Sequence, residues 1–399
     1  MIAHVDADAF FASVLMRIHP ELKGKPLFAI GMGGSCIIAA SYEAKAKGVK
    51  TGMRLTEARV LCPGAVEMDS DFRETGLASE QIESILKDVC PIVEQMSIDE
   101  WFLDLTSLVG GAPASPVDWA RNIQTTVRTM TDITVSIGVA SSKLLAKMAG
   151  EYHKPAGVTV LRAEEIEAFL KDRPAAAIPG IGPRRKVHTD HAGWLTAWDI
   201  ATASEAALRK ICGSPGPEMK RELLGECLSA VTADTRPPKS ISRCRSFRAT
   251  PDTKLLRAHL LKHLEYCTMK MRREGLACRE IGIWLRTADY QHVGKHHRLS
   301  RAATTVDEMM PSVLTMLDRL TWNKTRWTQA GLALGGLMGS GGLQQSLFDD
   351  PVKVLNEEHL QAAMDNLQTR FGRDSITRAS ALPVSSGTRQ DFDLPLVAS

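Results

Sequence analysis

The 399-residue sequence has few of the features that mark membrane, secreted or zinc-binding proteins. No apolar run approaches the ~20 residues that a membrane-spanning helix needs, and no basic-then-apolar leader follows Met1. Eight cysteines are scattered without any Cys-x-x-Cys pair, which excludes the usual zinc-ribbon spacing and provides no disulfide framework. We therefore expect reduced thiols, a cytoplasmic location and no membrane partner.

What is present is an ordinary globular composition, 44% hydrophobic and 24% charged, in a chain long enough for roughly two to four domains. The net charge of +3 hides an asymmetry, because residues 236–300 contain 15 Lys or Arg against 5 Asp or Glu. A basic segment on a mildly acidic body indicates contact with a polyanion. A solvated helix face with spare charge is the alternative interpretation.

The hydrophobic patterns predict an α+β multidomain chain. "IAHVDADAF" is typical of a strand, and "PLFAIGMGGSCIIAASYEAKAKGV" predicts a strand, a glycine turn, a second strand and a short helix. A helix is expected over residues 80–93, and only helical patterns over 164–232. The Pro-bearing segment "DTRPPKS" predicts a linker. The basic segment alternates helix with strand, the strands being "REIGIWLRTADY" and "QAGLALGGLM".

Acidic residues cluster at two points. "HVDADAFFASV" at 4–14 places Asp6 and Asp8 before two phenylalanines, and "SIDE" at 97–100 places Asp99 and Glu100 at the head of an apolar strand. A helix cap and a solvated turn are the simplest interpretations. Three carboxylates from two strands would also suit hard divalent cations such as Mg²⁺. Neighbouring residues of a regular strand point to opposite faces, so Asp99 and Glu100 share a site only if the strand start bends.

Four segments, "HVDADAFFASV", "SYEAKAKGVKTGM", "SIDEWFLDLT" and "SIGVASSKLLAKMAGEYHKPAGV", strongly resemble the Y-family DNA polymerases in order and spacing. These are translesion enzymes of the DNA polymerase IV (DinB) and UmuC types. The basic segment, with "RCRSF", "AGLALGG" and "QQSLFDD", leans toward UmuC, and the subtype stays open. The resemblance implies a right-hand polymerase with a palm at 1–11 and 72–163, small fingers at 12–71, a helical thumb with a helix-hairpin-helix at 164–233, a linker at 234–239, an α+β little finger at 240–342, and a clamp-binding peptide and tail at 343–399.

The resemblance also implies a catalytic metal site. Asp6, Asp99 and Glu100 match the metal-binding carboxylates, with the Ala7 carbonyl as an additional ligand, and Asp8 is expected to be structural. Two Mg²⁺ ions, or Mn²⁺ as an alternative, would then support in-line phosphoryl transfer.

The nucleotide contacts implied by the resemblance come from three segments. Phe11 matches a steric gate against a 2′-hydroxyl, whereas Phe10 is expected to pack in the core. Tyr42, Lys45 and Lys154 match triphosphate contacts. Lys45 stands where Arg is frequent, and a lysine lacks the bidentate fork of arginine, so we expect weaker or less oriented nucleotide binding. Lys143 and Lys147 also match family lysines, with ordinary exposed helix charges as the alternative.

Contacts with primer-template DNA are expected from two basic regions, and a partner contact from the tail. In "IPGIGPRRK" the turn could equally be a helix C-cap, and the tail side chains could fold back on the body. The candidate DNA contacts are Gly180, Gly182, Arg184, Arg185, Lys186, Arg243, Arg245, Arg248 and Arg286. Gln344, Leu347 and Phe348 of "QQSLF" match the peptide that binds the bacterial sliding clamp.

The expected function is template-directed DNA synthesis from dNTPs with low fidelity, as in lesion bypass during the SOS response. Two rivals are a non-catalytic relative that scaffolds repair partners and a two-metal nuclease. The carboxylates argue against the first, and the gate and triphosphate contacts argue against the second. The lesions bypassed, the fidelity, the oligomeric state and any need for UmuD-like or recombinase partners stay open.

Overall fold

The computed structural model describes residues 1–31, 35–233, 237–321, 325–341, 351–372, 375–376 and 378–381. These residues fall into two compact units, with residues 1–233 in the first and residues from 237 onward in the second. The division lies within the segment 234–239 that the sequence predicts as a linker. No helix in the described part of the chain is both long and apolar enough to cross a bilayer.

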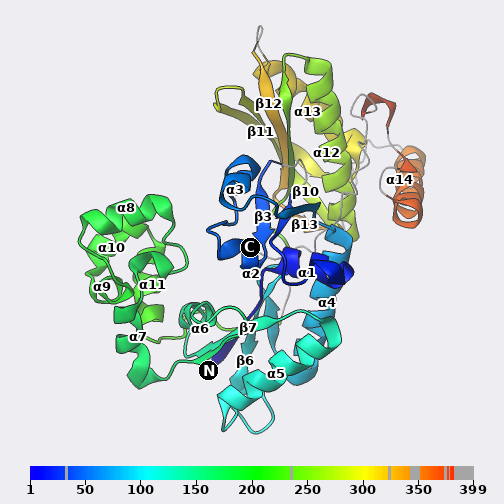
Figure 1. The fold of residues 1–399 in the computed structure, drawn as a ribbon. Helices are drawn as coiled ribbons and strands as arrows, with labels where there is room; N and C mark the ends of the chain where they lie inside the picture. Colours follow the sequence, from blue (N-terminus) through cyan, green and yellow to red (C-terminus); the bar gives the residue numbers. More distant parts are fainter. Residues whose placement is uncertain are drawn as a thin grey trace. The chain divides into compact units, whose positions relative to one another are not determined.

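The first unit is built around a five-stranded sheet in the order β5-β6-β1-β7-β8 (Figure 1). Its strands are β1 (Ile2–Ala7), β5 (Val93–Gln95), β6 (Glu100–Asp104), β7 (Val135–Ala140) and β8 (Val158–Val160). Helices α4 (Phe72–Val89) and α5 (Pro116–Thr131) bury one face, where they share a core with the odd-numbered residues of β1. Helix α6 (Lys143–Gly150) packs on the other face, against β1 and β7.

A second, smaller sheet of the first unit has the order β3-β2-β4. Strands β2 (Leu27–Ile30), β3 (Ile37–Ala40) and β4 (Val66–Asp69) pack with helices α1 (Phe10–Ile18), α2 (Tyr42–Lys45) and α3 (Leu55–Leu61). The two predicted strands and the short helix are confirmed here, whereas residues 32–34 of the predicted glycine turn lie outside the described part of the chain. Ser41 caps α2, because its hydroxyl accepts the Ala44 N–H at 3.4 Å.

Residues 164–232 are helical, as predicted. Helices α7 (Ile166–Asp172), α8 (Pro183–His191), α9 (Ala197–Thr202), α10 (Glu205–Cys212) and α11 (Pro215–Leu223) follow one another, and one isolated bridge pairs Pro174 with Thr196. Their buried side chains join those of α6 in one core. This helical region is therefore attached to the sheet face that carries α6.

The second unit is an antiparallel sheet in the order β11-β10-β12-β9 with two helices on one face (Figure 1). The strands are β9 (Ile241–Thr250), β10 (Leu276–Thr287), β11 (His292–Ala303) and β12 (Trp327–Gly335), with a short β13 (Met338–Gly339) paired to β10. Helices α12 (Thr253–Arg273) and α13 (Val306–Leu320) share a core with the inward-facing strand residues. Helix α14 (Pro351–Phe371) follows.

The predicted elements need correction at one helix and one strand. The helix expected at 80–93 begins earlier, at Phe72, because Asp71 caps it by accepting the N–H groups of Arg73 and Glu74. It also ends earlier, at Val89, and Val93 is the first residue of β5. Strand β11 was not predicted, because it is an edge strand whose mostly polar sequence lacks an apolar alternation. All eight cysteines are free, as expected.

Candidate active site

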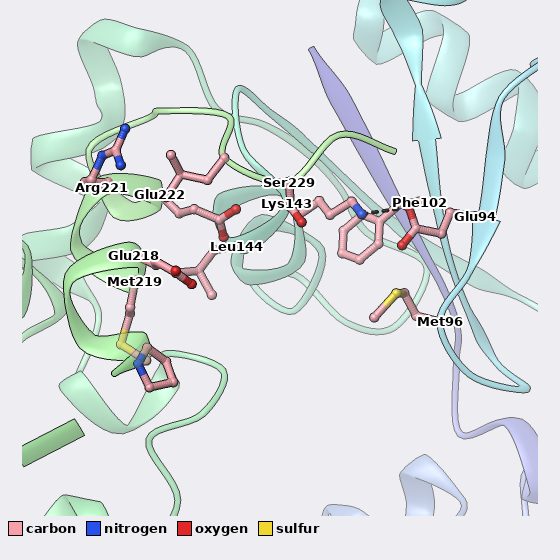
Figure 2. Close-up of a pocket in the computed structure, with 12 residues that line it drawn as sticks. Glu94, Met96, Phe102, Lys143, Leu144, Glu218, Met219, Arg221, Glu222 and Ser229 are labelled. Atoms are coloured by element: carbon pink, nitrogen blue, oxygen red, sulfur yellow. Dashed lines mark hydrogen bonds and ion pairs between the residues drawn. The ribbon is translucent and has the colours of Figure 1, made fainter. Parts of the chain in front are cut away.

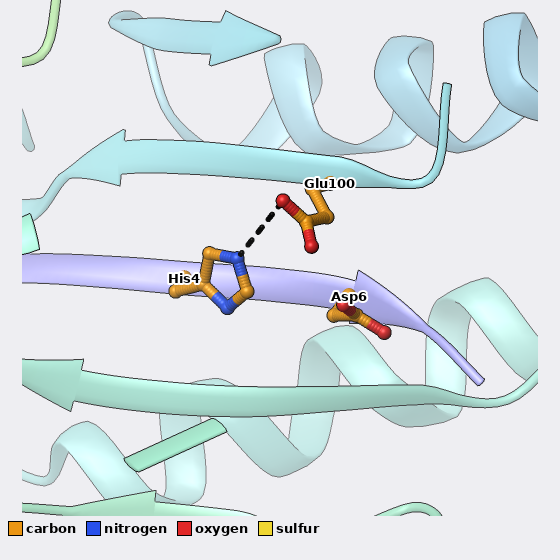
Figure 3. A group of neighbouring side chains, drawn as sticks. All are labelled: His4, Asp6 and Glu100. Carbon is orange, nitrogen blue, oxygen red and sulfur yellow. Dashed lines mark ion pairs between the residues drawn. The ribbon is translucent and has the colours of Figure 1, made fainter. Parts of the chain in front are cut away.

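The alternation of strand β1 explains why a core strand carries carboxylates. Ala3, Val5 and Ala7 face the core under α4 and α5, so His4 and Asp6 point to the opposite face. Asp6 lies directly opposite Glu100 on β6, and side chains opposite each other share a face. The site is drawn in Figure 3: ligand atoms of His4, Asp6 and Glu100 lie within 4.8 Å of one another.

Asp99 lies in the turn before β6 and is outside that group of three. Its backbone carbonyl accepts the Ala7 N–H at 2.9 Å, and its carboxylate accepts the Ser97 hydroxyl at 2.6 Å. Burial raises the pKa of Asp99, and the charge of Glu100 adds to this increase. The structure thus brings two of the three predicted carboxylates together, with the third held beside them by Ser97.

Sequence reasoning missed His4, although its place two residues before Asp6 in a strand could have identified it. The imidazole is fully buried, packs against Phe102 with ring centroids 4.9 Å apart, and has its Nε2 4.0 Å from Glu100 Oε2. Burial lowers the pKa of His4, so a neutral imidazole beside Glu100 is favoured.

Two lysines neutralise the paired carboxylates. Lys154 Nζ donates to Asp6 Oδ1 at 2.5 Å and to Glu151 at 2.6 Å. Lys147 on α6 donates to both oxygens of Glu100, at 2.7 and 2.6 Å, and is therefore not an ordinary exposed helix charge. Burial raises the pKa of Asp6 to about 7 despite Lys154. Burial would also raise the pKa of Glu100, but His4 and Lys147 outweigh it and hold that pKa at about 2.

Asp8 holds the end of β1 in place. Its Oδ1 accepts the Ser136 hydroxyl at 2.7 Å and the Tyr42 hydroxyl at 3.3 Å, and its Oδ2 accepts the Ala156 N–H at 2.8 Å. The carboxylate is 1% exposed and thus fully engaged inside the protein. These contacts support the structural role expected for Asp8.

The predicted nucleotide contacts lie on segments next to the carboxylates. Lys45 Nζ lies 4.4 Å from the centroid of the Tyr42 ring, and burial together with the nearby charge of Lys154 lowers the pKa of Lys45. Phe11 is half-buried, with its ring edge-on to Phe10 and Phe72 at 6.1 and 5.8 Å. Phe10 is 2% exposed and packs in the core, as predicted.

The candidate helix-hairpin-helix loop has the backbone that its glycines predict. Gly180 has φ +94°, which favours glycine, and Gly182 precedes the first turn of α8. Arg185 folds back to donate to the Gly180 carbonyl at 2.9 Å, and Lys186 pairs with Asp190 at 2.5 Å. Arg184 is exposed, so it is the best placed of the three cations for a phosphate.

The four arginines singled out in the second unit divide between the two faces of its sheet. Arg243 lies on the helix side, with its guanidinium 4.3 Å from the Tyr266 ring centroid, and Arg245 is close enough to lower the pKa of buried His259. Arg248 is exposed, and Arg286 contacts Thr328 and Ser246 on the open side. The geometry therefore favours phosphate contacts for Arg248 and Arg286 over Arg243 and Arg245.

A cleft of about 680 Å³ opens between α6, the β5–β6 hairpin and α11 (Figure 2). Lys143 lies on one wall, where it donates to Glu94 at 2.7 Å with its ammonium 5.5 Å from the Phe102 ring centroid. Glu218 and Glu222 line the opposite wall, and burial raises the pKa of Glu222. The lining excludes Asp6, Asp99 and Glu100, and its carboxylates disfavour a phosphate ligand.

The residues 344, 347 and 348 of the predicted clamp-binding peptide lie outside the described part of the chain.

Comparison with known sequences covers both units. A sequence model of the impB/mucB/samB family matches residues 5–151, and one of the impB/mucB/samB family C-terminal domain matches residues 238–347. The DNA polymerase IV of Moorella thermoacetica is 31% identical over 392 residues, covering 94% of this chain and 95% of that protein. A DNA polymerase IV of Dehalococcoides mccartyi is 31% identical over 384 residues, covering 94% and 96%.

Comparison with solved structures agrees with the sequence comparison. A Y-family DNA polymerase chimera of Dbh and Dpo4 superposes with a TM-score of 0.76 at 26% identity, covering 85% of this chain and 99% of that one. An insertion ternary complex of Dbh DNA polymerase superposes with a TM-score of 0.60 at 25% identity, covering 85% of this chain and 99% of that one. The resemblance inferred from four short segments and the expected fold are both confirmed. The chain therefore belongs to the impB/mucB/samB family, the Y-family of translesion DNA polymerases.

Proposed function

We propose that this chain extends a primer 3′-hydroxyl with dNTPs through divalent ions held by Asp6, Asp99 and Glu100. The observation that carries the proposal is the pairing of Asp6 with Glu100 across β1 and β6, with the predicted triphosphate contact Lys154 bonded to Asp6. Membership of the family makes the chain a DNA-directed DNA polymerase. The proposal adds which of its residues do which part of the chemistry.

The donor set fits hard cations. Carboxylate oxygens are the ligands that Mg²⁺ and Mn²⁺ prefer, and two ammonium groups already compensate the charge of these carboxylates. The Ala7 carbonyl is retained as an additional ligand, as the family motif implies. When bound, two such ions activate the primer hydroxyl and neutralise charge on the leaving pyrophosphate.

The surrounding residues orient the nucleotide. Lys154 and Lys45 attract the triphosphate as point charges. Tyr42 lies at the same edge, and its hydroxyl would leave Asp8, to which it now donates, in order to donate to the triphosphate. Phe11 closes the sugar side with a ring supported by Phe72, so a 2′-hydroxyl is rejected by steric overlap. His4 and Lys147 act on Glu100 as positioning residues.

The named parts of a right-hand polymerase are proposed for these segments. The five-stranded sheet would be the palm (1–11 and 72–163), the β3-β2-β4 sheet the fingers (12–71), helices α7 to α11 the thumb (164–233), and the second sheet the little finger (240–342). Fingers of this size close loosely on the nascent pair, which favours lesion bypass at the expense of fidelity.

Contacts with primer-template DNA are proposed for the loop of Gly180 and Gly182, with Arg184 as its most available cation, and for Arg248 and Arg286 in the second unit. Arg185 and Lys186 would need to leave their present partners. Such contacts position DNA without reading its sequence and weaken steeply with salt.

Clamp binding through Gln344, Leu347 and Phe348 is proposed from the sequence alone. A cytoplasmic location is proposed with it, and the free cysteines support a reducing compartment. Loss of clamp binding in a Leu347→Ala, Phe348→Ala variant that still extends primers is the expected result, and unchanged binding would contradict this assignment.

Primer extension with a single dNTP and Mg²⁺ tests the central proposal. Wild-type protein should add that nucleotide, whereas a nuclease would shorten the primer and a non-catalytic relative would leave it unchanged. Asp99→Ala should abolish extension while primer-template binding stays within about three-fold, because phosphate contacts supply most of that affinity. A larger loss of binding would show that Asp99 is structural.

A further inference from the structure

Lys154 lies in the loop between α6 and β8, residues 151–157, which we name the lysine loop. The end of this loop is bonded to the five-stranded sheet, because the Ala156 N–H donates to Asp8 Oδ2 at 2.8 Å. A lysine side chain has a long flexible stem, so its ammonium stays at one point only if the backbone that carries it is held. The contacts at the start of the lysine loop therefore matter for Lys154 as well.

Tyr152 holds the start of the lysine loop against the end of helix α7. Its ring is edge-on to the Phe169 ring, with centroids 5.4 Å apart, and the guanidinium of Arg173 lies 4.1 Å from its centroid. The Tyr152 hydroxyl donates to Asp172 Oδ2 at 3.3 Å, and Arg173 pairs with the same carboxylate. A ring, a cation and a carboxylate from one helix end thus contact a single side chain of the loop.

The guanidinium of Arg173 is placed by aromatic rings more than by hydrogen bonds. Its Nε is buried and has no hydrogen-bond partner among the described residues, although an unpaired buried donor costs free energy. The guanidinium also lies 5.9 Å from the Phe169 ring centroid, and the side chain is only 26% exposed. A cation over a ring is attracted most strongly when it is partly removed from water, so the contact with Tyr152 stabilises this position.

Helix α7 is itself well anchored. Ile166 and Leu170 are buried in the core that α7 shares with α6, and the Arg173 carbonyl accepts the Ala197 N–H at 2.8 Å. Tyr152 therefore ties the lysine loop to a fixed element of the first unit, two residues before Lys154.

Lys154 has to exchange partners in the proposed reaction. Its ammonium now bonds to Asp6 and Glu151, at 2.5 and 2.6 Å, and Asp6 is a proposed metal ligand. Binding of metal and triphosphate transfers the ammonium from a carboxylate to a phosphate. A lysine on a held backbone makes this exchange with a smaller loss of conformational entropy than a lysine on a loose loop.

We propose that Tyr152 and Arg173 are positioning residues for the incoming nucleotide, because they fix the lysine loop to α7 and so hold Lys154 where the triphosphate binds. The inference deepens the proposed function and rests on it, since Lys154 is the triphosphate contact proposed there. Neither Tyr152 nor Arg173 touches the nucleotide in this mechanism, and both act through Lys154.

Binding of the next correct dNTP tests the proposal without turnover, using the full chain, Mg²⁺ and a primer that ends in a dideoxynucleotide. Tyr152→Ala should weaken dNTP binding about five-fold, because the cation–π contact that ties the loop to α7 is lost. Tyr152→Phe keeps the ring and should stay within about two-fold of wild type. Arg173→Ala should weaken dNTP binding about three-fold, and Arg173→Lys should restore part of the loss, because an ammonium also binds the face of a ring.

Combination with Lys154→Met separates positioning from packing. Lys154→Met alone should weaken dNTP binding about ten-fold, through loss of a charge-assisted phosphate contact. In that background Tyr152→Ala should have no further effect on dNTP affinity, because the side chain that it positions is gone. The same fold-loss from Tyr152→Ala in both backgrounds would show that Tyr152 contributes only to packing, and would overturn the inference.

Lys171→Ala is the matched control, because it removes a cation–π contact of the same helix that does not involve the lysine loop. The Lys171 ammonium lies 5.8 Å from the Trp198 ring centroid. The variant should bind dNTP as wild type does, with circular dichroism showing equal helix content in Lys171→Ala and Tyr152→Ala. A similar loss of dNTP affinity in both variants would assign the effect to α7 as a whole and would also overturn the inference.

Failure of the proposed function gives a different pattern of results. If Lys154→Met weakens dNTP binding and Tyr152→Ala does not, the inference fails alone, whereas unchanged dNTP affinity in Lys154→Met contradicts the proposed triphosphate contact. In the second case Mn²⁺ titration without nucleotide still tests the loop. Tyr152→Ala should then strengthen Mn²⁺ binding about two-fold, since a less firmly held Lys154 competes less for Asp6. Unchanged Mn²⁺ affinity would show that Tyr152 does not position Lys154.

Discussion

The carboxylate site of the first unit and the open sheet face of the second use charge in opposite ways. Asp6 is buried and Glu100 half-buried, and each is held by one specific ammonium at 2.5 to 2.7 Å. Arg248 and Arg298 are exposed, so water solvates their charges. Buried charges need defined partners, whereas exposed cations act mainly through their combined field.

This difference has a consequence for mutation. Removing one buried charge leaves its partner uncompensated at the proposed catalytic site, so single substitutions there should have large effects on primer extension. Removing one exposed cation subtracts a small part of a shared affinity, so effects in the second unit should be small and additive.

The largest effect is expected for Asp6→Asn, which keeps the shape of the side chain and removes its charge. Primer extension should fall about a thousand-fold, because the site loses an anionic ligand and leaves Lys154 facing an amide. Arg248→Ala is the comparison, since it removes an exposed charge and should lower extension at saturating DNA less than two-fold by the same reasoning. Similar losses of primer extension in the two variants would contradict the proposed difference between buried charges in the first unit and exposed charges in the second.

The next effect concerns substrate choice. Phe11→Ala should admit ribonucleotides, lowering the preference for dNTPs on the order of a hundred-fold, because the ring braced by Phe72 is removed. This preference is measured by letting a dNTP and the matching rNTP compete for incorporation on one template. Phe10→Leu is the control, since Phe10 is buried in the core and its loss should lower stability without changing sugar choice. An unchanged preference for dNTPs over rNTPs in Phe11→Ala would contradict the assignment of Phe11 as the steric gate.

Much of the fold and of the site could be predicted from the sequence because strand alternation decides both. Apolar Ala3, Val5 and Ala7 determine which way Asp6 points. Asp99 lies in the turn before β6, where strand alternation no longer applies, and its part in the site stays a prediction. The same alternation would have identified His4.

Features formed by tertiary contact could not be predicted. Lys147 reaches Glu100 and Lys154 reaches Asp6 over long separations in the chain, and no local pattern marks such ion pairs. The sequence predicts Arg243 as a phosphate contact, and no local pattern indicates that its guanidinium lies over the ring of Tyr266. Strand β11 lacks an apolar period because it lies at the edge of the sheet.

A smaller effect is expected if the Lys154 ammonium competes with a metal ion for the carboxylate of Asp6. Lys154→Met should weaken dNTP binding about ten-fold, because a charge-assisted phosphate contact is lost. In the absence of nucleotide it should strengthen Mn²⁺ binding by about five-fold, since the cation bonded to Asp6 is removed. Mn²⁺ titration followed by electron paramagnetic resonance measures this without any turnover.

Lys45→Met is the matched control for that experiment, because it removes a nearby positive charge that lies over Tyr42. We expect it to weaken dNTP binding while Mn²⁺ affinity stays close to wild type. Equal Mn²⁺ affinity in wild type and Lys154→Met would show that the ion pair with Asp6 does not compete with metal.

The smallest effect lies in the second unit, where two histidines of α12 are buried against the sheet. Burial lowers the pKa of His259 from 6.5 to about 4 and that of His263 to about 3, with Arg245 and Arg243 adding to the two decreases. Both are neutral in the folded unit, so the unfolded chain binds more protons below pH 6.5. Stability is therefore complete above that value and declines as pH falls from 6.5 toward 4.

Hydrogen exchange of peptides covering α12, corrected for the intrinsic effect of pH, should show lower protection at pH 5 than at pH 7. His263→Gln should reduce this loss, because a neutral amide takes no proton on unfolding. Protection in β1 should change less, because the pKa of Asp6 is raised to about 7 in the folded unit. Folded Asp6 binds a proton as pH falls from 7 to 5 that the unfolded carboxylate does not bind, and this opposes the loss from buried His4. An equal loss in both units would show that the acid response does not come from these buried histidines.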